Sequence, residues 1–182
     1  MNRFFFALWP DNTTREVILN VRSQLALSGR MTAKSNLHMT LLFLGKLSVN
    51  QQQNIIKRAE QIVCPEFEMH ITLSGYFNNS KAAWLGVKLI PEVLLELHKH
   101  LLLAADKSHI PIKPQAYKPH VTLARKASPV STLRVSPIMW PVTDFVLLES
   151  IDTDQGVLYQ VVQHFTLQTD KKGGIAPPLA KK

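Results

Sequence analysis

The chain has 182 residues, of which 46% are hydrophobic and 19% are charged, and this composition excludes a disordered protein. The length suits one domain or two small lobes that can bury a hydrophobic core without disulfide bonds or a structural metal. The formal net charge is +8, but four lysines lie in residues 171–182, so the basicity is compatible with an RNA partner without being evidence for one.

The sequence favours a cytoplasmic protein. Its one cysteine, Cys64, cannot form an internal disulfide, which fits a reducing compartment. The apolar run at the start meets Pro10 too early for a signal peptide, and no later run could span a membrane. We expect a monomer with no membrane partner, a single domain over residues 1–170, and a flexible basic tail over residues 171–182.

Capping residues and periodicity predict the elements of the first half. The aromatic run 3–8 indicates a central strand. Thr13, with Glu16 three residues later, has the form of a capping box for a helix that reaches about Leu27. A strand follows over residues 37–45, and Ser48 with Gln51 opens a second helix that runs to Cys64.

The second half alternates in the same way. The patterns predict a hairpin of strands 67–74 and 82–89, a helix 91–107 that begins at a proline, a strand 117–125, and two final strands 142–149 and 157–168. The segment 129–141 contains three prolines, so we predict an irregular surface connection there.

Two of these strands carry the same short motif, in which a histidine precedes a threonine by two residues. The pairs are His38 with Thr40 and His120 with Thr122. Side chains at i and i+2 of a strand leave the same face, so each imidazole and its hydroxyl point into one space. Two such pairs could hold a phosphate and move protons on either side of it.

The other histidines favour surface roles. His70 also precedes a threonine by two residues, but Glu68 and Ser74 share its face, which indicates the solvent side of an edge hairpin. His98 and His100 lie two residues apart on a helix, where they cannot share one metal ion. Neither motif strand contains Asp or Glu, and the chain has no glycine-rich phosphate loop, so we expect no metal and no cofactor.

The order of elements contains an internal echo. Each motif strand follows a helix, and the two motif histidines are 82 residues apart. This echo predicts an α+β fold of two similar lobes, with helices outside and a cleft between them.

Two segments carry a resemblance to a known family. Residues 36–45 read NLHMTLLFLG and residues 119–125 read PHVTLAR. They resemble the two signature motifs of the two-histidine (2H) phosphoesterase superfamily, and within it the RNA 2′,3′-cyclic phosphodiesterases, also called the 2′-5′ RNA ligase family. The likeness extends to the RFF start and to WLG at residues 84–86.

The resemblance implies a bilobal fold with antiparallel sheets, a pseudo-two-fold axis through the cleft, and hydrolysis of RNA 2′,3′-cyclic phosphate ends to 2′-phosphates without metal. RNA ends or small cyclic nucleotides would be the partners. By the same likeness, His38 is the proton donor and His120 the proton acceptor, Thr40 and Thr122 bind the phosphate oxygens, and Arg125 adds positive charge beside them.

Some assignments stay open at this stage. Strict alternation places Arg125 on the face opposite His120, so it can serve the cleft only if the strand bends or ends there. Phe43, Tyr76 and Tyr117 could stack on a nucleobase, although core packing is the simpler interpretation of Phe43.

Two other functions are compatible with the same residues. A 2′-5′ RNA ligase acting on tRNA halves would run the reverse reaction, and an RNA-end binder would hold the phosphate without turnover. A merely structural domain gives no account of the paired motifs.

Overall fold

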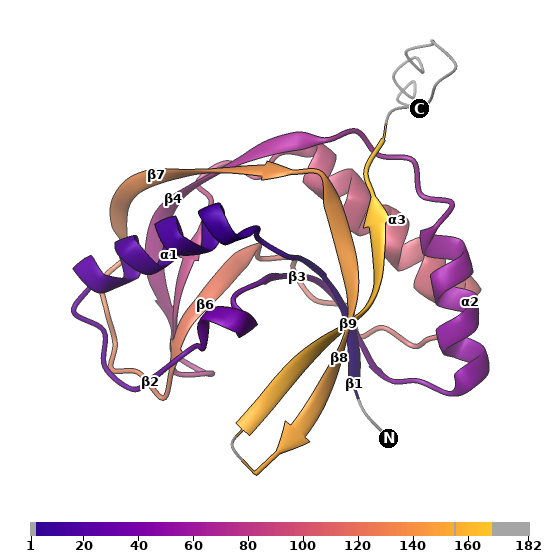
Figure 1. The fold of residues 1–182 in the computed structure, drawn as a ribbon, viewed down its shortest axis with the longest axis horizontal. Coiled ribbons are helices and arrows are strands. Elements are labelled where there is room, and N and C mark those ends of the chain that lie inside the picture. Colours follow the sequence, from indigo (N-terminus) through magenta and orange to yellow (C-terminus); the bar gives the residue numbers. More distant parts are fainter. Residues whose placement is uncertain (1–2, 155, 169–182) are drawn as a thin grey trace.

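The computed structural model describes residues 3–154 and 156–168, which form an α+β fold (Figure 1). The elements are β1 (Arg3–Leu8), α1 (Asn12–Gln24), β2 (Arg30–Met31), the short 3₁₀ helix η1 (Lys34–Asn36), β3 (Met39–Lys46), α2 (Val49–Ala59), β4 (Phe67–Phe77), β5 (Ala82–Gly86), α3 (Glu92–Lys107), β6 (His120–Arg125), β7 (Leu133–Val142), β8 (Asp144–Thr153) and β9 (Gly156–Thr166). The α+β class predicted from the sequence is confirmed.

The strands pair in the order β7-β4-β5-β6-β3-β1-β8-β9, with β2 added beside β6, and all the pairs are antiparallel. Two groups of strands result, β7-β4-β5-β6 and β3-β1-β8-β9. They meet where β3 pairs with β6. This junction is the middle of the strand order. His120 is the first residue of β6, and His38 directly precedes β3.

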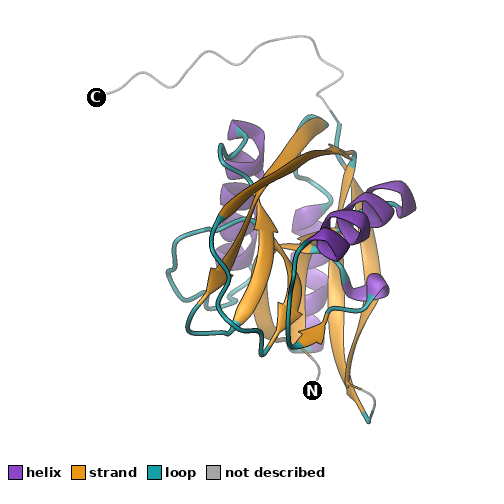
Figure 2. Cartoon of the chain, turned by 90° about the vertical axis from the view of Figure 1, so that its left-hand side faces the viewer, coloured by secondary structure: helices purple, strands orange, loops and turns teal. Residues whose placement is uncertain are grey.

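The helices pack on different strand groups. The helix α1 contacts β7, whereas α3 contacts β3 and also α2. Figure 1 shows α1 beside β7 and the other two helices together at the opposite end, and Figure 2 shows helices on either side of the strands.

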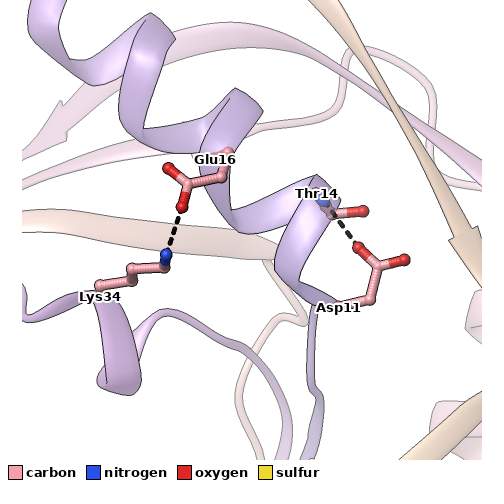
Figure 3. Close-up of polar contacts among 4 residues, drawn as sticks. All are labelled: Asp11, Thr14, Glu16 and Lys34. Atoms are coloured by element: carbon pink, nitrogen blue, oxygen red, sulfur yellow. Dashed lines mark hydrogen bonds and ion pairs between the residues drawn. The ribbon is translucent and has the colours of Figure 1, made fainter.

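The helix boundaries follow local capping chemistry. The predicted capping box of α2 is confirmed, since Ser48 and Gln51 bond each other reciprocally. The predicted cap of α1 at Thr13 is wrong, because Asp11 is the N-cap and its carboxylate accepts a 2.6 Å bond from the Thr14 N–H (Figure 3). The helix ends at Gln24 rather than near Leu27.

One hydrophobic cluster unites both strand groups and all three helices. Phe6, Ile18, Ile55, Leu85 and Leu101 belong to it and are fully buried, and they come from β1, α1, α2, β5 and α3 respectively. Burial of that many apolar side chains in one cluster holds the two groups in a fixed relation.

The sequence predicted an irregular connection over residues 129–141, and this prediction is wrong from Leu133 onward. Residues from Leu133 onward form β7, which pairs with β4, so β4 is an interior strand and not part of an edge hairpin. Pro141 and Pro137 are tolerated because β7 lies at the end of the strand order, where one side needs no N–H, and because Pro137 falls in a break of the register. The strand predicted over 82–89 ends earlier, at Gly86.

Among the described residues, no helix has the length and apolarity that crossing a membrane requires. The predicted tail, residues 171–182, lies outside the part of the chain that the structure describes.

Candidate active site

The two motifs meet at the junction of β3 and β6. Met39, which follows the first histidine, pairs with Val121, which follows the second. An antiparallel register continued by one residue each way sets His38 beside Thr122 and Thr40 beside His120. Since Met39 and Val121 are both buried, the four polar side chains emerge together on the opposite face.

The two imidazoles are oriented in the same way. The Nδ1 of His38 bonds the carbonyl oxygen of Asn36 at 2.7 Å, and the Nδ1 of His120 bonds that of Lys118 at 2.6 Å. A carbonyl can only accept, so both rings carry their proton on Nδ1 and offer Nε2 to the cleft. The Nε2 of His38 lies 3.1 Å from the Oγ1 of Thr40.

Each motif strand contains a bulge directly after its threonine. Beside β1, Thr40 pairs with Ala7 and Leu42 with Phe6, which leaves Leu41 as the extra residue. Beside β5, Thr122 pairs with Trp84 and Ala124 with Ala83, which leaves Leu123 as the extra residue. A bulge shifts the alternation of the strand by one residue.

The bulges explain where Phe43 and Arg125 point. Both residues follow their histidine by five positions, so strict alternation sends them to the opposite face, but the extra residue returns them to the cleft. Phe43 is accordingly 58% exposed and lines a cavity with His120, and Arg125 lines one with His38. Core packing of Phe43, the simpler interpretation of the sequence, is therefore wrong.

Each bulge carbonyl has its own donor. The Nδ1 of His98, on α3, bonds the carbonyl oxygen of Leu41 at 2.8 Å, and the N–H of Thr32 bonds that of Leu123 at 2.8 Å. These bonds replace the ladder partner that a bulge removes. The prediction of His98 as helix surface is wrong, since its ring also stacks on Tyr117 at 4.1 Å between centroids.

Both catalytic candidates have a lowered pKa. The pKa of His38 falls to about 4, chiefly through burial; the bond to Asn36 opposes this, and the charges of Arg125 and His120 add to it. Rings of Phe5 and Tyr159 contact the imidazole, with centroids 5.1 and 5.0 Å away. The pKa of His120 is lowered too, first by burial and then by Arg125, against its bond to Lys118.

Two cavities flank the histidine pair. A cavity of about 190 Å³, here called the arginine cavity, is lined by Arg30, His38, Thr122, Arg125 and Tyr159 among others. A larger one of about 660 Å³, the aromatic cavity, is lined by Thr40, Phe43, Phe77, Tyr117 and His120 among others. No Asp or Glu within the described residues lines either one, so both favour an anion.

The two tyrosines predicted to stack on a base lie in different places. Tyr117 lines the aromatic cavity, but the hydroxyl of Tyr76 donates to the carbonyl oxygen of Ala127 at 2.9 Å, and its ring packs with Ala83 away from the cleft. Phe77, the next residue along β4, points to the cleft instead, and its ring meets that of His120 at 4.8 Å. Phe77 could have been identified only with the pairing of β4 with β5, and of β5 with β6, already known.

Trp9 and Tyr159, both of which flank His38, were also missed. No signal in the sequence marks either one.

The remaining histidines lie elsewhere. His70 is exposed and its Nε2 bonds Glu68 at 2.7 Å, as the sequence interpretation of a solvent-facing side chain requires. His164 pairs with Asp144 at 2.8 Å. Among residues 3–154 and 156–168, no three His, Cys, Asp or Glu side chains come together in a metal-ligating group.

A model of one protein family matches most of this chain. The match is to the 2′-5′ RNA ligase superfamily and covers residues 10–154, which include both motifs. The chain belongs to this superfamily. Membership of the 2′-5′ RNA ligase superfamily agrees with the resemblance of residues 36–45 and 119–125.

Similar proteins span nearly the same length. An RNA 2′,3′-cyclic phosphodiesterase of Escherichia coli K12 is 32% identical over 81% of this chain and 86% of its own. One of Thermus thermophilus is 28% identical over 91% and 90%. The crystal structure of E. coli LigT in apo form matches with a TM-score of 0.84 at 29% identity, over 92% of this chain and 98% of that one. LigT complexed with 3′-AMP matches with a TM-score of 0.82, also at 29% identity, over 92% of this chain and 98% of its own.

Proposed function

We propose that this protein is a phosphodiesterase that hydrolyses RNA 2′,3′-cyclic phosphate ends to 2′-phosphate ends. The names of its superfamily relatives support this activity. The observation that carries it is the pairing of Met39 with Val121, which gathers two imidazoles and two threonine hydroxyls on one face. A phosphate between them would meet a proton carrier on each side.

The reaction needs a base and an acid in line with the phosphorus. A water oxygen attacks the phosphorus while the bond from phosphorus to the ribose 3′-oxygen breaks, and the phosphate stays on the 2′-oxygen. His120 takes the proton of the water on its Nε2, and His38 delivers a proton from its Nε2 to the departing 3′-oxygen. Both rings present Nε2 because their Nδ1 atoms are held by backbone carbonyls.

The hydroxyls of Thr40 and Thr122 and the guanidinium of Arg125 would stabilise the negative charge on the non-bridging phosphoryl oxygens. The phosphate also places a negative charge beside His38, which has no such charge near it among the described residues of the free protein. Its negative charge offsets the positive charge of Arg125, so binding raises the pKa of His38 toward the range in which the ring can donate.

The terminal nucleoside would occupy the aromatic cavity. Its volume of about 660 Å³ falls within the range of small-molecule sites. Phe43 presents an exposed ring there, and Phe77 and Tyr117 line the same space, so a base can stack without sequence preference. The complex of LigT with 3′-AMP supports a nucleotide site in this fold.

Turnover of adenosine 2′,3′-cyclic phosphate in the presence of EDTA tests the proposal. We expect 2′-AMP as the product, resolved from 3′-AMP by chromatography. His38→Ala and His120→Ala should each lower kcat by about 10² to 10⁴, the usual contribution of one general acid or base. His70→Ala is the matched control and should leave kcat unchanged; release of 3′-AMP, or full activity in either motif variant, would refute the assignment.

Two alternatives share the site. Ligation of tRNA halves through a 2′-5′ bond is not the reverse of this hydrolysis but the same ring opening, with the 5′-hydroxyl of the second half attacking the phosphorus in place of water. The superfamily name favours testing it with cleaved RNA halves and an assay for 2′-5′ linkages. An RNA-end binder would retain the substrate without product. Every residue of the proposed site comes from one chain, so we expect a monomer to be active, which size-exclusion chromatography with activity across the peak would test.

A further inference from the structure

The arginine cavity holds a cation that the proposed reaction does not use. Arg30 lines it together with His38, Thr122 and Arg125. Its backbone pairs with that of Arg125, so the two guanidinium groups start from neighbouring strands. The Nη1 of Arg30 comes 3.8 Å from where a Cβ at Gly156 would lie, which places the guanidinium at the base of the β8–β9 hairpin turn.

The position of Arg30 is set by a close approach of the backbone. The preceding residue, Gly29, has a φ of 84° and lies so near β6 that a Cβ there would come 2.5 Å from the carbonyl oxygen of Arg125. A larger residue would push β2 away from β6. The glycine therefore allows Arg30 to reach the wall of the cavity.

The cations near this cavity differ in whether an acidic side chain neutralises them. Lys34 is neutralised by an ion pair with Glu16 of α1, which also anchors η1 to that helix (Figure 3). Arg30 and Arg125, by contrast, have no hydrogen bond or ion pair to any of residues 3–154 and 156–168 through their side chains. A cavity with two such guanidinium groups and no acidic lining suits phosphate, and because Arg125 is assigned to the reacting phosphate, Arg30 is the group left to bind a second one.

We propose that Arg30 binds a second phosphate of the substrate, the 5′-phosphate of the terminal nucleotide, in the arginine cavity. This inference rests on the proposed function. The reacting phosphate uses Arg125 and the two motif threonines, and the base uses the aromatic cavity on the other side of the histidines. Of the two arginines that line the cavity of about 190 Å³, these assignments leave Arg30 for the next anion of the chain, so the preferred substrate is an RNA end rather than a free cyclic nucleoside.

The test compares adenosine 2′,3′-cyclic phosphate with the same compound carrying a 5′-phosphate. For the wild type we expect a higher kcat/KM with the 5′-phosphate. Arg30→Gln should lower kcat/KM for the 5′-phosphorylated compound about threefold to tenfold, as expected for the loss of one partly exposed charged contact. It should leave kcat/KM for the compound without the 5′-phosphate unchanged. Arg30→Lys should recover part of the preference.

Two controls make the result specific. Arg134→Gln removes the same charge at an exposed position of β7 outside both cavities, and it should change kcat/KM for neither substrate. Lys118→Gln removes a cation from the aromatic cavity instead, and the preference for the 5′-phosphate should persist in this variant. With a dinucleotide that ends in the cyclic phosphate, the slope of log(kcat/KM) against log[salt] should flatten by about 0.7 in Arg30→Gln, because one phosphate contact is lost.

Several outcomes would overturn the inference while leaving the proposed function intact. These are equal losses on both substrates in Arg30→Gln, no loss on either, no preference in the wild type, or loss of the preference in Lys118→Gln in place of Arg30→Gln. Failure of the wild type to turn over the compound without a 5′-phosphate would instead refute the proposed function, and the inference with it.

Discussion

The lowered pKa of His38 gives a sharp prediction for pH dependence. At pH 7 a group with a pKa of about 4 is protonated in about one molecule in a thousand, which corresponds to a cost of about 4 kcal/mol. A phosphate charge about 4 Å away contributes about 4 kcal/mol at an effective dielectric constant of 20. The substrate charge is therefore about sufficient to return His38 to a pKa near neutrality once it is bound.

The profiles of the free protein and of the complex should consequently differ. Catalysis needs one proton on the histidine pair, and both histidines have a pKa below 6.5 in the free protein. We expect kcat/KM, which reports the free protein, to fall about tenfold for each pH unit above 6.5. The constant kcat, which reports the complex, should fall only at higher pH, so KM rises as pH increases.

Initial rates with adenosine 2′,3′-cyclic phosphate between pH 5 and 9 would measure both profiles, and NMR titration of the histidine ring protons would give the pKa values directly. Arg125→Gln should lower the rate and also move the basic limb of kcat/KM to higher pH, since Arg125 lowers the pKa of both rings. Arg134→Gln should do neither. A kcat/KM that stays flat or rises from pH 6.5 to 8.5 would refute this account.

Further predictions concern stability, the aromatic cavity, the bulge and metal. A buried neutral His38 binds fewer protons than the unfolded chain between pH 6.5 and 4, so the free energy of unfolding should fall by about 2 kcal/mol from pH 7 to pH 5, and by less in His38→Gln, in urea titrations. Phe43→Ala should raise KM with little change in the urea midpoint, because the ring is 58% exposed. His98→Leu removes the donor to the Leu41 carbonyl and should cost about 1 kcal/mol of stability and lower kcat more than it changes KM; an unchanged kcat would show that the bulge holds without it. Dialysis against EDTA should leave kcat unchanged, since two imidazoles supply both proton transfers.

Much of this protein can be predicted from its sequence because the signals are local. The i, i+2 spacing of His38 with Thr40 and of His120 with Thr122 is a property of any strand, and so is the alternation that places Met39 and Val121 inside. The Ser48 capping box is equally local. These patterns predicted the α+β class and both histidine–threonine pairs without knowledge of any partner strand.

Tertiary structure decided what depends on a neighbouring strand. A bulge exists only relative to the strand it pairs with, so the turn of Phe43 and Arg125 into the cleft requires β1 and β5. The same holds for β7, where the prolines suggested a loop but an edge position tolerates them.

The charge state of the site is also tertiary. His38 loses its proton affinity because rings from β1 and β9 exclude water and Arg125 of β6 adds positive charge. No spacing in the sequence encodes these contacts. The sequence by itself determined which residues could do the chemistry, and the packing of strands distant along the chain decided which way they face and which protons they hold.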